Sequence, residues 1–226
     1  MLNYILATDK SWHVDYFLLN RHQLQGNWSL STCPADLEEQ ASKFAPRFIF
    51  FPHWSEIVPE RIFEKYDCVC FHMTDVPFGR GGSPLQNLIV RGHYKTVVSA
   101  LKMNEGIDSG PVYLKCELDL TGSALDIFKR TAPVCFEMMR KIHMEEMAPV
   151  EQEGKPTIYK RRTPAESLIP ESLSINKLYD FVRMLDAPNY PKAFLLHGDL
   201  RVEMFNARID NDKTLSAEVR VIKDEK

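Results

Sequence analysis

The chain has 226 residues, of which 44% are hydrophobic, 26% charged and 11% aromatic. This composition is that of a folded globular protein and excludes a disordered or fibrous chain. Its 28 Lys and Arg and 31 Asp and Glu residues give a formal net charge of −3, without the global basic surplus that a large nucleic-acid footprint needs.

The first 72 residues alternate apolar and amphipathic segments. Strands are expected at 3–7, 28–32, 48–51 and 68–72, and helices at 13–24, at 34–44 and directly after Pro59. The third and fourth strands are continuously apolar, which is typical of strands covered on both faces. The alternation predicts an α/β fold with a largely parallel sheet.

After His72 the pattern changes to a loop, residues 73–84, with two prolines and three glycines. Further along, we expect a helix at 85–90, strands at 97–103 and 112–118, a turn-rich loop at 104–110 and a long helix at 123–147. Pro133 lies inside the long helix and is expected to kink or divide it.

The rest of the chain reads as a linker and a small C-terminal part. Residues 149–172 are polar and carry four prolines, and we expect them to wrap the main domain because Ile158 and Tyr159 need a surface to cover. Then follow a helix at 174–186 with Ser174 as its N-cap, a hairpin about Gly198 within 193–209, and a strand at 216–222. The predicted domains are 1–148, a linker over 149–172 and a subdomain over 173–226.

The five cysteines are an odd number, and residues 1–7 lack the basic start of a secretory leader. We therefore expect reduced thiols in a cytoplasmic protein. Cys68 and Cys70 have no second pair nearby, so no metal site is expected. Apolar runs such as 48–51 fall far short of the ~20 residues that cross a bilayer, so no membrane contact is expected either.

Two residues stand where an α/β sheet collects its ligands, at the ends of strands. His72 ends a buried strand, and its alternative role is that of a buried histidine satisfied by the backbone. Asp108 follows another apolar strand and can act as a general base, as a histidine orienter or only as a turn residue. Two such loops can converge on one cleft.

Common nucleotide and hydrolase motifs are missing. The loop at 78–83 lacks the G-x-x-x-x-G-K-[ST] pattern, and no G-x-G-x-x-G follows the first strand. Neither Ser83 nor Thr74 stands in a G-x-S-x-G setting.

Residues 72–84 resemble the signature of the folate-dependent formyltransferases. That family has His, then Ser two residues on, Pro at five, Arg-Gly at eight and nine, and Pro at twelve; here these places hold His72, Thr74, Pro77, Arg80, Gly81 and Pro84. The family's Asp-x-Gly motif is matched by Asp108 and Gly110. Residues 161–164 and 186–194 resemble its linker and the start of its C-terminal domain, so the resemblance covers 46–209.

The resemblance implies a Rossmann-like formyltransferase fold, with 1–148 as an N-terminally shortened catalytic domain. It implies 10-formyltetrahydrofolate as the donor and a primary amine as the acceptor. Asp108 would accept or orient the amine proton, and His72 would stabilise the oxyanion and protonate the leaving nitrogen. The implied folate-binding residues are Trp54, Ser55, Glu56, Ile57, Glu105, Ile107 and Asp108, and the implied substrate-binding residues are Thr74, Arg80 and Gly81. Core packing is the alternative role for Trp54.

The chain departs from the family at Cys70, where an asparagine would donate to the oxyanion and a thiol is a weak donor. His53, Gln86 and Asn87 are candidate substitutes, and the choice among them stays open. The chain before His72 is about one strand–helix unit short. The C-terminal part is too brief for the full barrel of the initiator-tRNA members.

Net charge and the short C-terminal part argue against tRNA, and a free-standing chain argues against a carrier protein. We therefore expect the acceptor to be an amino sugar on a nucleotide, with no nucleic-acid partner. The cations expected near its phosphates are Arg80, Lys95, Arg161 and Arg162. The short strands within residues 193–222 could pair with a partner's sheet edge, so a homodimer through the C-terminal region is one option and the oligomeric state stays open. The alternatives are an aminoacyl group on a carrier protein or initiator tRNA, and a non-catalytic folate-binding module.

Overall fold

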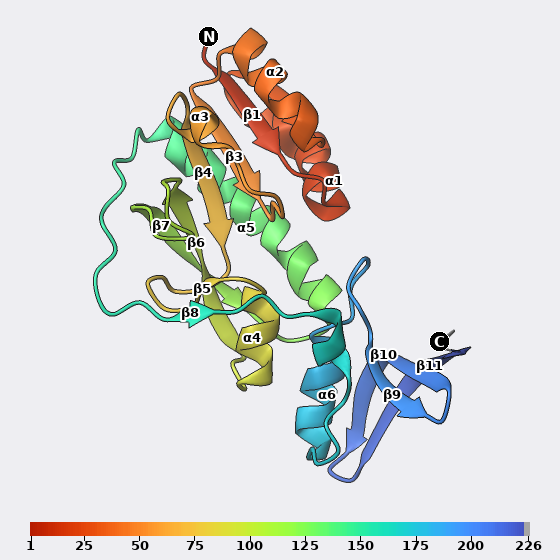
Figure 1. Cartoon of the computed structure of the whole chain (residues 1–226). Helices are drawn as coiled ribbons and strands as arrows, with labels where there is room; N and C mark the ends of the chain where they lie inside the picture. Colours follow the sequence, from red (N-terminus) through yellow and green to blue (C-terminus); the bar gives the residue numbers. More distant parts are fainter. Residues whose placement is uncertain (224–226) are drawn as a thin grey trace. The chain divides into compact units, whose positions relative to one another are not determined.

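The computed structural model describes residues 1–223 (Figure 1). The chain divides into two compact units. Unit 1 consists of residues 1–81, 96–118 and 128–158, and unit 2 of residues 82–95, 119–127 and the chain from 159 onward.

Unit 1 is built on a six-stranded sheet with the order β2-β1-β3-β4-β6-β7. Figure 1 labels β1, β3, β4, β6 and β7 of this sheet. The strands are β1 (Asn3–Ala7), β2 (Asn27–Ser31), β3 (Phe48–Pro52), β4 (Asp67–His72), β6 (Lys95–Lys102) and β7 (Val112–Asp119). β1 pairs in parallel with β2 and β3, and β3 in parallel with β4, whereas β4 and β6 are antiparallel. The predicted α/β class with a largely parallel sheet is confirmed.

The helices between these strands agree with the predicted pattern to within a few residues. They are α1 (Ser11–Asn20), with a 3-10 turn at Arg21–Gln23, α2 (Pro34–Phe44) and α3 (Glu60–Phe63). One apolar cluster joins α2 to the central strands through Leu37, Ala41, Ile5, Ile49 and Phe51, each at most 1% exposed. The continuous apolar run of β3 thus reflects burial on both faces.

The long helix α5 (Ala124–Met144) runs unbroken through Pro133, so the expected division does not occur. An interior proline costs ~3 kcal/mol or more through its lost N–H and its clash with the preceding turn. Burial of a large apolar side chain contributes ~1.5–3 kcal/mol, and α5 buries several, among them Phe128, Met138 and Ile142. The buried face therefore outweighs the proline.

Unit 2 combines α4 (Pro84–Val90) and α6 (Ile175–Arg183) with a three-stranded antiparallel sheet. Its strands are β9 (Ala193–His197), β10 (Leu200–Asn211) and β11 (Thr214–Lys223), in the order β11-β10-β9. The hairpin about Gly198 and the last strand are as predicted. Three elements of the whole described chain were not predicted. They are the short strands β5 (Arg80–Gly81) and β8 (Ile158–Tyr159), which pair with each other, and a 3-10 turn at Pro164–Ser167.

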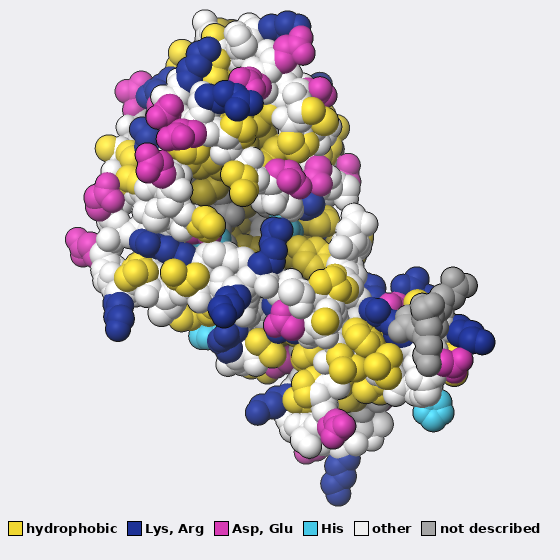
Figure 2. Space-filling view, in the orientation of Figure 1, with side chains coloured by type: hydrophobic (Ala, Val, Ile, Leu, Met, Phe, Trp, Pro, Cys, Tyr) yellow, Lys and Arg dark blue, Asp and Glu magenta, His cyan; other side chains and the backbone are white. Residues whose placement is uncertain are grey.

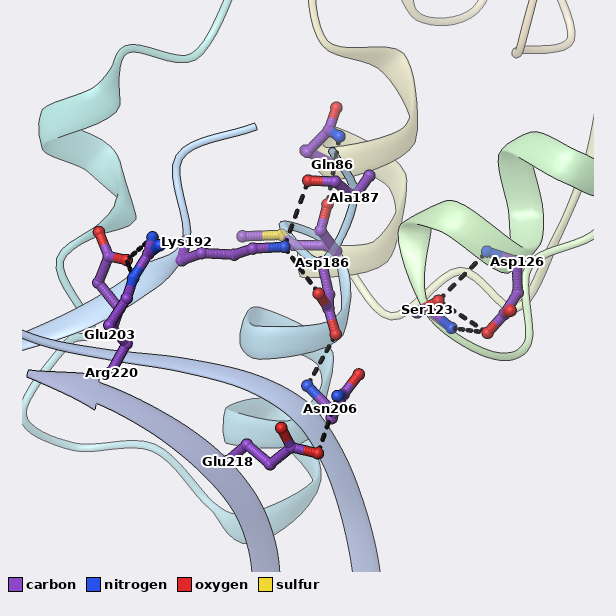
Figure 3. A network of polar contacts seen from close by, with 11 residues as sticks. Gln86, Ser123, Asp126, Asp186, Ala187, Lys192, Glu203, Asn206, Glu218 and Arg220 are labelled. Atoms are coloured by element: carbon purple, nitrogen blue, oxygen red, sulfur yellow. Dashed lines mark hydrogen bonds and ion pairs between the residues drawn. The ribbon is translucent and has the colours of Figure 1, made fainter. Parts of the chain in front are cut away.

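A polar network holds the end of α6 to the sheet within unit 2 (Figure 3). Asp186 accepts hydrogen bonds from Lys192 Nζ and from the Asn206 N–H, both at 2.8 Å. Asn206 has a φ of +50° at an irregularity of β10, and its side chain donates to Glu218. One carboxylate therefore fixes both the 186–192 loop and the bend of the long strand.

Charges of both signs are interspersed over the visible surface (Figure 2). No helix within residues 1–223 is long and apolar enough to cross a membrane.

Candidate functional site

His72 is the last residue of β4, a central strand of unit 1, and its side chain is 7% exposed. The strand is apolar before it, with Cys68, Val69 and Phe71 buried. The chain then turns into the loop that includes β5. The strand thus delivers an imidazole to the carboxyl edge of the sheet, where ligands of α/β folds collect.

Asp108 lies in the loop between β6 and β7, with a φ of +49°. Aspartate tolerates this left-handed region better than most residues because its short polar side chain bonds locally. Two residues on, a Cβ on Gly110 would lie 1.8 Å from the Lys102 carbonyl oxygen, so glycine is required there. The Asp-Ser-Gly sequence therefore sets the turn that aims the carboxylate.

The two loops bring the imidazole and the carboxylate together. His72 Nδ1 lies 3.3 Å from Asp108 Oδ2, and His72 Nε2 lies 2.8 Å from the Gly79 carbonyl oxygen. The Gly81 N–H donates to Asp108 Oδ2 at 2.8 Å. A neutral imidazole has a single N–H, so only the imidazolium can donate to both acceptors. The arrangement therefore places a hydrogen-bond acceptor beside each ring nitrogen of His72.

The residues expected to bind substrate have structural partners here. Thr74 is fully buried and donates to the Gly79 carbonyl oxygen at 3.2 Å. The half-buried Arg80 guanidinium donates through Nε and Nη2 to Gln152 Oε1, at 3.1 and 2.8 Å. Gly81 contributes its N–H to Asp108. These three residues therefore shape the His72 loop.

Cys70 precedes His72 by two residues on β4. Burial, and next the charge of Asp108, raise the pKa of the Cys70 thiol well above its usual range. A thiol is nucleophilic as the thiolate, which this environment disfavours. Nucleophilic catalysis by Cys70 is therefore not supported.

The expected folate-binding residues form two groups. Trp54 is half-buried and packs on the apolar cluster that joins α2 to the central strands. Its ring lies edge-on to that of Phe51, with ring centroids 5.6 Å apart. Ile57 and Ile107 are 93% and 76% exposed. Their neighbours in the two loops, Ser55, Glu56 and Glu105, are at least partly exposed as well.

The residues of these two loops have the chemistry to bind a flat ring that carries polar atoms on its edge. Among the described residues, no group is bonded to the buried indole N–H of Trp54. The exposed Ile57 and Ile107 offer apolar surface, and the loop backbone offers hydrogen-bonding groups. In the described part of the chain, no group of three or more His, Cys, Asp or Glu side chains is placed to hold a metal ion.

The candidate substitutes for the missing asparagine are used elsewhere. His53 lies edge-on to Phe128 at 4.5 Å between ring centroids, and burial lowers the pKa of His53 to about 3. In unit 2, Gln86 donates to the Met184 carbonyl oxygen, and Asn87 donates to three backbone carbonyl oxygens. The amide groups of Gln86 and Asn87 are therefore already engaged by the local fold.

Of the expected phosphate-binding cations in unit 2, Arg162 serves the local fold. It donates to the Glu166 carbonyl oxygen and its guanidinium lies over the Phe181 ring, 5.8 Å from the centroid. Burial lowers the pKa of Arg162 from its usual value. Lys95 and Arg161 are exposed.

Sequence reasoning missed two residues of the predicted linker, Gln152 and Thr157. Gln152 Nε2 donates to the backbone oxygens of Asp108 and Gly110, at 2.9 and 2.7 Å. Thr157 Oγ1 accepts from the Gly79 N–H at 2.7 Å. The only signal in the sequence was the need of the adjoining Ile158 and Tyr159 for a surface.

Comparisons with known proteins identify relatives of this chain. Residues 164–222 match the family model described as the C-terminal domain of methionyl-tRNA formyltransferase. A solved methionyl-tRNA formyltransferase from Clostridium thermocellum is 41% identical, with a TM-score of 0.94, covering 99% of this chain and 100% of that chain.

Two further proteins are more distant. The methionyl-tRNA formyltransferase of a Nitratiruptor species is 29% identical over 145 residues, 62% of this chain and 48% of that protein. This chain thus spans about half the length of that curated relative. HypX from Aquifex aeolicus, solved in complex with tetrahydrofolic acid, shares the fold, with a TM-score of 0.74 and 17% identity over 90% of this chain and 37% of that one.

These relatives overturn the expected acceptor and partners. The curated relative and the 41% identical solved structure are both methionyl-tRNA formyltransferases, so the amino sugar, its sugar nucleotide and the exclusion of nucleic acid are wrong. The short C-terminal part was also misleading, because residues 164–222 match the C-terminal domain of that enzyme. Neither a net charge nor a domain length reports the chemistry of the acceptor.

Proposed function

The chain belongs to the folate-dependent formyltransferase family, and we propose that it transfers a formyl group from 10-formyltetrahydrofolate to the methionyl amino group of initiator tRNA. The observation that carries this proposal is the end-to-end similarity, at 41% identity, to a methionyl-tRNA formyltransferase. The pairing of His72 with Asp108 in the two family motifs supports it.

When bound, 10-formyltetrahydrofolate supplies a formyl group carried on a nitrogen atom. In our proposal, Asp108 Oδ2, already oriented by the Gly81 N–H, accepts the proton that the attacking amine loses. His72 presents an N–H to the negative charge that develops on the formyl oxygen, and then gives a proton to the leaving nitrogen. To do so through Nε2, His72 exchanges its bond to the Gly79 carbonyl for one to the substrate.

We further propose that folate lies along the loops at 54–57 and 105–108. Ile57 and Ile107 would cover its ring, because both are largely exposed without it. Burying an apolar side chain of this size contributes ~1.5–3 kcal/mol. The backbone of Ser55 and Glu105 would take the polar edge of the ring.

The direct test incubates the protein with 10-formyltetrahydrofolate and methionyl initiator tRNA and measures a 28-dalton mass gain on the released aminoacyl group, roughly one CO added. The expected result is transfer to the initiator tRNA, abolished or reduced ~10²- to 10⁴-fold in His72→Ala and Asp108→Asn. Methionyl elongator tRNA and a free methionine ester serve as alternative acceptors.

Two outcomes contradict the proposal. The first is transfer to the free ester at the same rate as to initiator tRNA, which would place recognition outside the nucleic acid. The second is thermal stabilisation by folate without transfer to any amine, which is the behaviour of a folate-binding module without catalysis.

A further inference from the structure

Residues 150–157 cross both loops of the candidate site within unit 1. At one end, Val150 exchanges two backbone hydrogen bonds with Val112, at 2.7 and 2.8 Å. At the other end, the Thr157 N–H donates to the Pro77 carbonyl oxygen and the Thr157 carbonyl oxygen accepts from the Arg80 N–H, at 3.1 and 3.0 Å. Gln152 lies between these anchored ends.

The Gln152 carboxamide contacts both loops at once. Its Nε2 donates to the Asp108 and Gly110 carbonyl oxygens, at 2.9 and 2.7 Å, on either side of the turn that aims the carboxylate. Its Oε1 accepts from Arg80 Nε and Nη2, at 3.1 and 2.8 Å, in the loop that follows His72. Both amide N–H groups and the amide oxygen are therefore used.

A carboxamide is the side-chain group that this position requires. It faces two carbonyl acceptors on one side and a guanidinium donor on the other, and it offers two donors and one acceptor at that reach. A carboxylate of the same length would keep the bond to Arg80 but set a negative oxygen against the Asp108 and Gly110 carbonyls. A thioether of similar length would make none of the four bonds.

We propose that Gln152 is a positioning residue that fixes the Asp108 carboxylate relative to the His72 imidazole. The expected effect of Gln152 on the reaction rate rests on the proposed function, because His72 and Asp108, 3.3 Å apart, are the proposed proton-transfer pair. Gln152 acts through the backbone, because its amide N–H groups donate to the carbonyl oxygens of Asp108 itself and of Gly110, two residues on, while its amide oxygen accepts from Arg80. A displacement of ~1 Å at a reacting group costs on the order of 10²-fold in rate.

The test compares Gln152→Met and Gln152→Glu with Gln25→Met, a matched substitution at an exposed glutamine. We expect kcat on methionyl-tRNA to fall by about 10- to 100-fold in both Gln152 variants and to stay unchanged in the control. The KM for 10-formyltetrahydrofolate should change by less than about threefold. A role in folding alone would lower the yield of folded protein and leave kcat per folded molecule unchanged.

A double-mutant cycle with Asp108→Asn tests whether Gln152 affects the rate through Asp108. If Gln152 acts through Asp108, Gln152→Met should cost less than about threefold in the Asp108→Asn background. A loss in that background as large as in the wild type would overturn the proposal. So would a kcat of Gln152→Met equal to that of the wild type.

A second measurement does not depend on the acceptor. The Gly81 N–H is bonded to Asp108 Oδ2, so its hydrogen exchange reports whether the carboxylate stays in place. Gln152→Met should accelerate this exchange about tenfold or more relative to amides of β4, and Gln25→Met should not. Unchanged exchange would refute the positioning role even in an inactive protein, whereas accelerated exchange in a chain that formylates no tRNA would leave it standing and reject the proposed function.

Discussion

The buried His13 and the half-buried His53 of unit 1 should make the fold acid-sensitive. His13 is 4% exposed, and its ring lies 6.4 Å from that of His53, between centroids. Burial, and next the neighbouring His53, lower the pKa of His13 to about 3. Burial, and next the charge of Lys10, lower the pKa of His53 to about 3 as well. Both rings therefore stay neutral in the folded protein well below neutral pH.

The sign and size of the change in the free energy of unfolding with pH follow from the linkage between proton binding and folding. An unfolded histidine titrates near pH 6.5, so below that pH the unfolded chain binds protons that the folded protein does not. The contribution of the two neutral rings to the free energy of unfolding is fully present above about pH 6.5 and is lost as the pH falls toward about 3. Between pH 7 and pH 5 the loss is about 2 kcal/mol for each ring, or about 4 kcal/mol for both. That is a large share of the ~5–15 kcal/mol that a domain has.

The assay is urea unfolding at pH 7 and pH 5 on the wild type, on His13→Phe and on His53→Asn. Asparagine suits position 53 because His53 has a φ of +52°. Each variant should reduce the stability difference between the two pH values by about 2 kcal/mol, whatever its absolute stability. The exposed His22→Gln is the control and should leave the difference unchanged. A wild type that is equally stable at both pH values would refute this reasoning.

Three further outcomes follow from single contacts. Cys70→Asn places an amide donor two residues before His72, the proposed catalytic histidine, and should raise kcat about tenfold in steady-state assays. An unchanged kcat would mean that another group already donates to the oxyanion. Gly110→Ala sets a Cβ 1.8 Å from the Lys102 carbonyl oxygen, so this variant should lower kcat more than about tenfold and lower the melting temperature. A fully active variant would contradict the requirement for glycine in this turn. Arg183→Met removes the ion-pair partner of the buried Asp180, Arg183 Nε at 2.7 Å, and should destabilise unit 2 by about 3–5 kcal/mol in chemical unfolding. A loss under about 1 kcal/mol would mean that the pair is solvated.

Local signals in the sequence were enough to predict the sheet and to place His72 and Asp108 after apolar strands, whereas their proposed roles came from the family resemblance. The apolar runs ending at Pro52 and His72 needed burial on both faces, which a parallel sheet provides. Asp108 followed from the same rule about strand ends, because its loop comes after another apolar strand. These inferences rest on neighbours within a few residues along the chain.

Contacts that depend on distant chain positions could not be predicted. Gln152 bonds to Asp108 across 44 residues and to Arg80 across 72, and nothing near it in the sequence marks it. The course of α5 through Pro133 is similar, because the proline penalty is local and the burial that outweighs it comes from other segments. In both cases tertiary packing determines the structure, and the sequence pattern indicates only the contribution of residues close together in the chain.

The acceptor was mispredicted because net charge is not a property that a bound nucleic acid senses. The 59 charged Asp, Glu, Lys and Arg side chains share an accessible surface of 12565 Å², which leaves about 15 Å between neighbouring charges. At physiological ionic strength a charge is screened beyond ~8 Å. A phosphate therefore interacts with the few cations beside it, and a sum of −3 over the whole chain is compatible with a local basic track. Exposed cations such as Lys160 and Arg161, adjacent in the chain, are where that track should be sought, by the salt dependence of tRNA binding in charge-reversal variants.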